Sequence, residues 1–179
     1  MYVPMGNRAY LIGDIKFLQL VKQRREKKMT TIKTINKFTG KYRFLSNFYI
    51  SEIKYEDQLF PSSEHAYQAA KTTDKALREI LTDAGVSAGQ AKRVGRQFKL
   101  RDGWDDIKAD IMKDIVRLKF FRNSGLALKL IDTGDATLIE GNTWGDVFFG
   151  EGRIYGLTRR AYTGGILLLQ SFSRTGRRV

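Results

Sequence analysis

The 179-residue chain contains no cysteine, which excludes disulfide bonds, thiol nucleophiles and thiolate metal sites together. Histidine occurs only once, at His65, so we expect neither a histidine-rich zinc site nor a serine–histidine triad. The chain has 2 prolines beside 17 glycines, which excludes a proline-rich linker and a collagen-like chain. No apolar run approaches the roughly 18 residues that a membrane-spanning helix needs, so no membrane partner is expected.

Positive charge is what the sequence has in excess. It contains 32 basic and 19 acidic residues, for a net charge of +13. Such a balance points to a nucleic acid or to a ligand that carries phosphates. The excess is concentrated at the ends, however, because residues 1–28 and 151–179 each carry a net +5 and the middle of the chain only +3. Whole-chain charge therefore says little about the middle of the chain.

The two basic ends suggest a division of the chain into three parts. In the first 28 residues an apolar stretch precedes the basic block, which reverses the order of a secretory signal. We therefore interpret residues 1–29 as a basic cytoplasmic extension. Residues 30–150 form the single predicted domain, and residues 151–179 form a basic C-terminal segment.

Periodicity in the middle part predicts a domain of mixed secondary structure. Apolar alternation indicates strands at 32–36 and 48–55, and the LFPSS sequence at 59–63 is interpreted as a breaker. Spacings of three and four indicate helices at 63–82, 87–96, 104–122 and 126–131, before a short strand at 137–140. The prediction is an α+β fold, mainly helical with a small β component, without the strand–helix alternation of a doubly wound sheet.

One face of the predicted helix at 63–82 combines four kinds of polar or aromatic group. Glu64, Tyr67, Gln68 and Lys71 recur at i, i+3, i+4 and i+7. A polar face opposite an apolar stripe is commonly just solvated. However, Glu64 lies in the first turn, where the helix dipole favours an ionised carboxylate. The set would also suit a sugar phosphate and an aromatic ring.

Other candidate residues lie in two loops and a basic run. Trp144, Gly145 and Asp146 end a glycine-rich segment that could stack a base beside a carboxylate, or could be a tight turn with the indole in the core. Arg43 could bind a phosphate and Asn47 a hydroxyl, although an edge strand is the alternative. The basic run is either a solvated or a phosphate-facing surface; it comprises Lys92, Arg93, Arg96, Lys99 and Arg101. His65 is interpreted as a hydrogen-bonded structural residue rather than a general base.

Several of these segments together resemble the NADAR domain family. The matching stretches, in family order, are FLSNFY (44–49), FPSSEHAYQAAK (60–71), AKRVGR (91–96), the helix start at Trp104 and LIEGNTWGD (138–146). The resemblance implies a compact α+β fold, phosphoribosyl or ADP-ribose-like ligands and cleavage of N-glycosidic bonds. It places catalytic positions on Glu64, Trp104 and Asp146, although pattern alone assigns Trp104 to the core.

The C-terminal segment departs from the family. After the WGD loop the family continues with a glycine-rich turn and a final helix, and neither can be placed on residues 151–179. Two interpretations stand: a divergent tail, or a frame-shifted reading of the usual end. The missing helix would help to close the pocket and pack the core.

The resulting hypothesis is an N-glycoside hydrolase that cleaves a bond between a (phospho)ribosyl group and a nitrogen base, as in riboflavin-biosynthesis intermediates. Glu64 and Asp146 share the two carboxylate roles of such a reaction, and the roles could be exchanged. Trp104 or Trp144 would stack on the base, and Arg43 and Lys71 would hold the phosphate. No metal or other cofactor is expected. The alternatives are a hydrolase or binder of ADP-ribose or NAD-derived ligands, and a basic nucleic-acid-binding module without catalysis.

Overall fold

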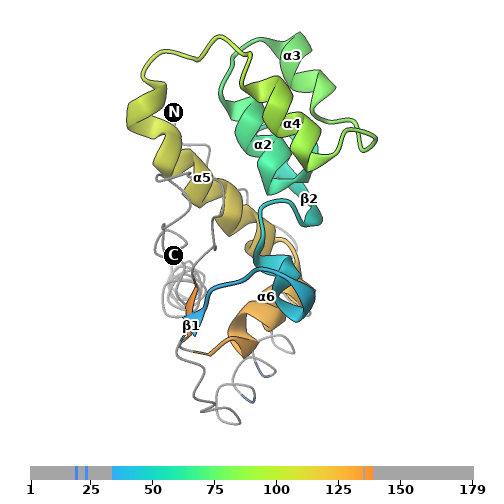
Figure 1. Ribbon diagram of the computed structural model, residues 1–179, viewed down its shortest axis with the longest axis vertical. Helices are drawn as coiled ribbons and strands as arrows, with labels where there is room; N and C mark the ends of the chain where they lie inside the picture. Colours follow the sequence, from blue (N-terminus) through green and yellow to red (C-terminus); the bar gives the residue numbers. More distant parts are fainter. Residues whose placement is uncertain (1–18, 20–22, 24–33, 135, 139–179) are drawn as a thin grey trace, which may run out of the picture.

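The computed structural model describes residues 34–134 and 136–138, together with residues 19 and 23. The predicted site residues Trp144, Gly145 and Asp146 lie outside these ranges, as does the C-terminal segment 151–179. The described elements run in the order β1 (Thr34–Ile35), η1 (Gly40–Leu45), β2 (Ile50–Tyr55), β3 (Gln58–Ser62), α2 (Ser63–Ala70), α3 (Lys75–Ile80), α4 (Ala88–Gly95), α5 (Trp104–Phe121), α6 (Ser124–Asp132) and β4 (Thr137–Leu138). The predicted α+β fold, mainly helical with small sheets, is confirmed (Figure 1).

The hairpin of β2 and β3 leads directly into the first described α-helix. The strands pair antiparallel, with Ile53 opposite Phe60, and the register shifts between Ile50 and Ile53. The predicted breaker at 59–63 is wrong, because residues 58–62 form β3. Pro61 is tolerated there because, within the described residues, β3 pairs on one side with β2 alone, and a proline whose nitrogen lies at the other edge breaks no ladder bond.

The helix predicted over 63–82 is in fact two helices. α2 ends at Ala70, and α3 begins at Lys75 behind a new N-cap, Asp74. Asp74 Oδ1 accepts hydrogen bonds from the backbone N–H groups of Ala76 at 2.9 Å and Leu77 at 3.2 Å. The backbone of Asp74 is extended, as is usual for an N-cap residue. An extended residue cannot continue a helix, so α2 does not run on into α3.

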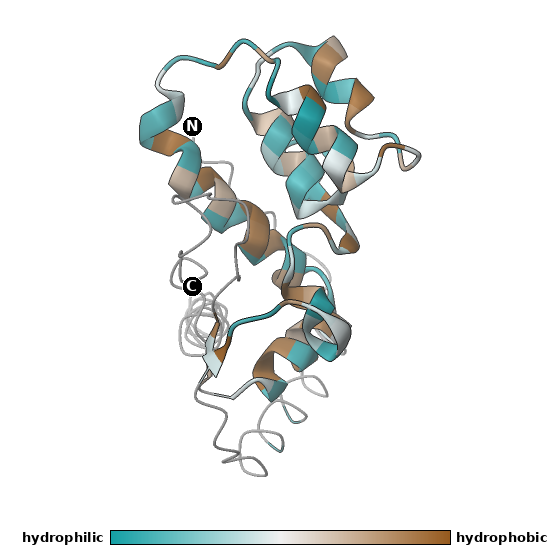
Figure 2. Cartoon of the chain, viewed as in Figure 1, coloured by the Kyte–Doolittle hydropathy of each residue, from teal (hydrophilic) through white to brown (hydrophobic). Residues whose placement is uncertain are grey.

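The remaining helices begin and end close to the predicted residues. α4 starts with a capping box, in which the side chains of Ser87 and Gln90 each bond to the other's backbone. α5 starts after Gly103, whose φ of +67° is a left-handed conformation that glycine adopts without strain. Asp105 and Asp106 occupy its first turn, where the helix dipole favours carboxylates. Hydrophobic and hydrophilic residues form stripes along α5, as expected for a helix with one buried face (Figure 2).

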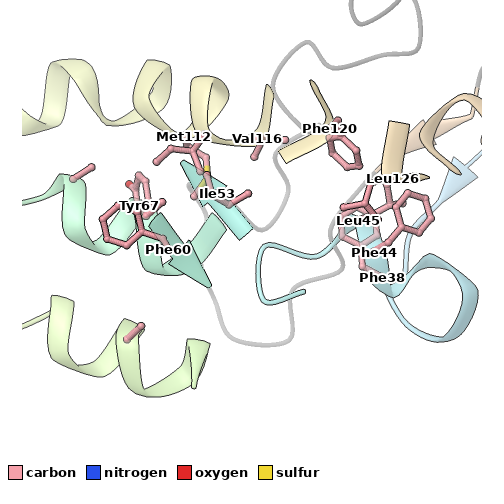
Figure 3. Close-up of a cluster of buried hydrophobic side chains, with 14 of the residues drawn as sticks. Phe38, Phe44, Leu45, Ile53, Phe60, Tyr67, Met112, Val116, Phe120 and Leu126 are labelled. Carbon is pink, nitrogen blue, oxygen red and sulfur yellow. The ribbon is translucent and has the colours of Figure 1, made fainter. Parts of the chain in front are cut away.

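The buried side chains form one connected core that lies along α5. Figure 3 shows two groups within it. One group lies between α2, the hairpin and α5, and its labelled members are Ile53, Phe60, Tyr67, Met112 and Val116. The other lies between η1, the C-terminal end of α5 and α6, and comprises Phe38, Phe44, Leu45, Phe120 and Leu126. The long helix therefore fixes the position of α2 relative to the rest of the described chain.

The first and last described strands close the fold. β1 pairs in parallel with β4, with Thr34 opposite Thr137 and Ile35 opposite Leu138. The predicted strands at 32–36 and 137–140 are thus confirmed where residues are described. None of the described helices combines the length and apolar composition that crossing a membrane requires.

Candidate functional site

Glu64 lies at the buried start of α2. Ser62 caps the helix, its hydroxyl accepting from the backbone N–H of His65. The backbone N–H of Glu64 donates to the carbonyl of Asn47 at 3.0 Å, which fixes the segment 46–49 against the helix start. Only 5% of Glu64 is exposed. A solvated face is therefore the wrong interpretation of this side of α2, because Tyr67 and Gln68 are buried as well.

The carboxylate of Glu64 is held by a side chain one turn further along α2. Gln68 Nε2 donates a hydrogen bond to Glu64 Oε1 over 2.7 Å, and both side chains are buried. Gln68 is in turn confined by α4, because a Cβ added at Gly95 would collide with Gln68 Oε1 and lie 2.8 Å from its Cβ. The absence of a side chain at position 95 thus leaves room for the amide that orients Glu64.

An aromatic pair involves Tyr67, which lies one turn along α2 from Glu64. The rings of Tyr67 and Trp104 have centroids 5.4 Å apart and are tilted by 49°, a geometry that is favourable for aromatic pairs. Trp104 is the first residue of α5 and is buried, so the two rings bring the start of α5 against α2. The ammonium group of Lys71 lies 5.8 Å from the centre of the Tyr67 ring.

Lys71 is half-buried at the end of α2. Burial lowers the pKa of its ammonium group, the nearby carboxylate of Glu64 opposes that change, and Lys92 and Arg96 of α4 lower the pKa further. The structure therefore brings together four of the predicted site residues, Glu64, Tyr67, Gln68 and Lys71, with Trp104 as a fifth.

His65 has the structural role that the sequence analysis assigned to it. The side chain is fully buried, with Nε2 2.7 Å from the carbonyl of Val86 and Nδ1 2.8 Å from the hydroxyl of Ser62. Because a carbonyl can only accept, Nε2 carries the proton and Nδ1 accepts from Ser62. Burial lowers the pKa of His65, while the hydrogen bond to Val86 partly offsets the change. A neutral imidazole with both nitrogens occupied has no position from which to act as a general base.

The two candidates from segment 41–49 differ in their positions. Asn47 is half-buried and contacts the start of α2 through its carbonyl. Arg43 is exposed on η1, and within the described residues no hydrogen bond or ion pair joins its side chain to the α2 group. Its predicted contact with phosphate stays a prediction.

Lys119 is a residue that the sequence analysis did not single out. It is 1% exposed, and its ammonium group donates to the carbonyl of Ser46 at 2.7 Å and lies 5.7 Å from the ring centre of Tyr49. The residue thus ties α5 to segment 46–49, which also contacts Glu64. The sequence signal for such a role is a lysine among the apolar residues of the helix predicted at 104–122. Within the described part of the chain, no cluster of histidine and acidic residues could hold a metal ion.

Comparison with known proteins places this arrangement in a family. The NADAR domain matches residues 34–165, which is most of the chain and extends past the predicted boundary at 150. A riboflavin biosynthesis protein of Vibrio vulnificus is 42% identical over 111 residues, covering 61% of this chain and 30% of that protein. The N-glycosidase YbiA of Escherichia coli is 34% identical over 113 residues, covering 62% of this chain and 69% of that protein. An N-glycosidase of Nostoc punctiforme is also 34% identical, over 116 residues, covering 62% of this chain and 73% of that protein.

A solved structure shows the same fold. The NMR structure of the E. coli protein YbiA superposes with a TM-score of 0.61 at 27% sequence identity, covering 89% of this chain and 97% of that one. This chain spans less than a third of the length of the Vibrio relative, whereas it spans more than two thirds of the E. coli and Nostoc relatives. The chain belongs to the NADAR domain family.

Proposed function

We propose that this chain is an N-glycosidase that hydrolyses the bond between a phosphoribosyl group and a nitrogen base. The observation that carries the proposal is the buried carboxylate of Glu64, which the amide of Gln68 orients beside an aromatic pair and a lysine. The names of the relatives, N-glycosidase and riboflavin biosynthesis protein, support the same class of reaction.

The reaction requires charge stabilisation at the sugar. Breaking the bond between the anomeric carbon and nitrogen leaves an oxocarbenium-like sugar, and an adjacent carboxylate stabilises that charge or activates water. The oxygen of water then bonds to the anomeric carbon, and the electron pair of the broken bond stays on the base nitrogen, which gains a proton. Glu64 supplies the carboxylate in this proposal, and Asp146, which lies outside the described residues, supplies the second.

The surrounding residues suit the two ends of such a substrate. In this proposal a planar base packs against the buried aromatic pair of Tyr67 and Trp104, and Lys71 offers a cation to the phosphate. Burial around Glu64 strengthens its interaction with a cationic transition state, because less water competes for the carboxylate. In this proposal residues 30–150 form the catalytic unit, and the substrate is a small molecule.

The experiment replaces the carboxylate by an amide of the same shape. We expect Glu64→Gln to lower the turnover of a phosphoribosylamino-pyrimidine by roughly 10²- to 10⁴-fold, measured as ribose 5-phosphate released. Glu52→Gln, the same change at an exposed position of β2, is the matched control and should leave turnover unchanged. Turnover of Glu64→Gln equal to that of the control would remove Glu64 from the reaction. Release of product only from ADP-ribosylated guanosine would instead select the ADP-ribosyl alternative.

A further inference from the structure

Two helix faces meet at the side of α2 that carries the candidate site. On α2 the face consists of Glu64, Gln68 and Lys71, at i, i+4 and i+7. On α4 and its C-cap, Lys92, Gly95 and Arg96 share a face at i, i+3 and i+4. The two faces meet where Gly95 packs against Gln68, since no Cβ fits between them. Lys92 and Arg96, one turn apart, are both close enough to Lys71 for their charges to act on it.

The charge at this contact is unbalanced. Within the described residues, the charges that act on Lys71 are two cations, Lys92 and Arg96, and one carboxylate, that of Glu64, which Gln68 already holds. Within the described part of the chain none of the three cations forms an ion pair with an acidic side chain. Like charges at close range oppose one another, and the two cations of α4 both disfavour the charged form of Lys71. A bound anion would remove this repulsion.

Exposure increases from the carboxylate toward the cations. Glu64 is buried, Lys71 and Lys92 are half-buried, and Arg96 is exposed. An anionic group at the rim of this contact would meet cations on two helices, while the part of the molecule attached to it extends toward the carboxylate. Arg96 also offers a planar guanidinium that can donate two parallel hydrogen bonds to one phosphate.

We propose that Lys92 and Arg96 of α4 complete, with Lys71, a phosphate-binding subsite for the sugar phosphate of the substrate. This inference rests on the proposed function for the identity of the ligand. It gives part of the basic run at 92–101 a binding role, and it predicts that Lys92 and Arg96, whose charges act on Lys71, behave differently from Arg93 and Lys99, which are not among the charges that lower the pKa of Lys71.

The test measures binding of ribose 5-phosphate to the full chain by calorimetry. Lys92→Gln and Arg96→Gln should each weaken binding by about 10- to 100-fold, the range expected when one charged hydrogen bond is lost. Arg93→Gln removes the same charge from the same helix and serves as the control, with a change of less than about threefold expected from long-range electrostatics alone. Thermal unfolding of each variant checks that α4 stays folded. Equal affinities for all three variants, or no binding to the unaltered chain, would overturn the proposal.

Two further ligands distinguish the source of the phosphate. If ADP-ribose binds more tightly than ribose 5-phosphate and loses affinity in the same two variants, the subsite stands and holds a diphosphate. If inorganic phosphate alone binds as tightly as ribose 5-phosphate, with no loss in either variant, the cations attract anions without forming a subsite, and the proposal is overturned.

Failure of this inference is separable from failure of the proposed function. Where turnover is measurable, both α4 variants should raise KM with little change in kcat, because the phosphate is remote from the bond that breaks. Turnover that requires Glu64, with unchanged KM in both variants, would overturn the subsite and leave the function intact. Binding that depends on Lys92 and Arg96, with no turnover of any N-glycoside, would leave the subsite intact and overturn the function.

Discussion

Substituting Gly95 by alanine adds one methyl group next to Gln68, the residue that holds the carboxylate of Glu64, and so tests that arrangement. In Gly95→Ala the new Cβ would collide with Gln68 Oε1 and lie 2.8 Å from Gln68 Cβ and 2.9 Å from Cδ. Overpacking of this kind costs about 1–3 kcal/mol. Replacing glycine in a helix by alanine returns about 0.5–1 kcal/mol. We therefore expect a net destabilisation of up to about 2.5 kcal/mol.

The assay is thermal and urea unfolding of the full chain, and the same helix provides the control. For a chain of this size each kcal/mol corresponds to about 2–4 °C in Tm. Gly89→Ala also lies in α4, but its Cβ would meet nothing within 4 Å, so that variant should be more stable than the parent by about 0.5–1 kcal/mol. The two alanine variants should thus shift Tm in opposite directions.

A second substitution identifies the atom responsible. In a Gln68→Ala background, Gly95→Ala should be less destabilising, because the amide of Gln68 is gone. The contact at 2.8 Å between the new Cβ and the Cβ of residue 68 remains, so stability should recover only in part. Where the parent chain shows turnover, Gly95→Ala should also reduce it, since displacing Gln68 removes the hydrogen bond to Glu64. If Gly95→Ala stabilised the chain as much as Gly89→Ala, the close packing of α4 on Gln68 would be refuted.

Two further predictions concern stability. Burial lowers the pKa of His65, so the unfolded chain binds a proton that the folded chain does not; stability should fall as the pH drops below the ordinary histidine value of 6.5. His65→Gln keeps a donor for the Val86 carbonyl and should flatten the dependence of the unfolding free energy on pH between about 8 and 5.5. An unchanged slope would contradict the neutral, buried state assigned to His65. Asp74→Ala removes the cap of α3 and should cost about 1 kcal/mol in urea unfolding. Asp74→Ser should recover most of that loss, and equal loss in both variants would show that the cap contributes nothing.

Apolar spacing and cap residues in the sequence predicted correctly those helices whose ends are set by residues close by in the chain. The helix at 104–122 was correct to within one residue because its apolar spacing is long and uninterrupted. The helix at 87–96 was correct because Ser87 and Gln90 form a capping box. The break between α2 and α3 was missed although Asp74 is a strong N-cap residue, because the apolar spacing continues across it. The strand β3 was missed because proline indicates a breaker unless the strand is known to lie at an edge.

Sequence spacing predicted which candidate residues lie together, but not their environment. Spacing placed Glu64, Tyr67, Gln68 and Lys71 on one face of a helix, and the structure confirms that they lie together. Spacing could not show that this face is covered, because the cover comes from α4 and α5, which are distant in sequence. For the same reason Gly95 and Lys119 could not be connected with Glu64 from the sequence. Whether a polar helix face is buried depends on the elements that pack against it, so the sequence of that helix alone does not show it.

The parallel pairing of β1 with β4 has a consequence for the order of folding. Thr34 and Thr137 meet across a loop of about 100 residues, and within the described residues the ladder that joins them is two residues long on each strand. So few hydrogen bonds cannot offset the entropy of closing that loop in an unfolded chain. We therefore expect the pairing to form only after α5 has packed on the hairpin and α6 on α5, which brings residues 34 and 137 together. On this expectation the sheet that closes the fold follows from the helical core, and the face of α2 that carries Glu64 is assembled first.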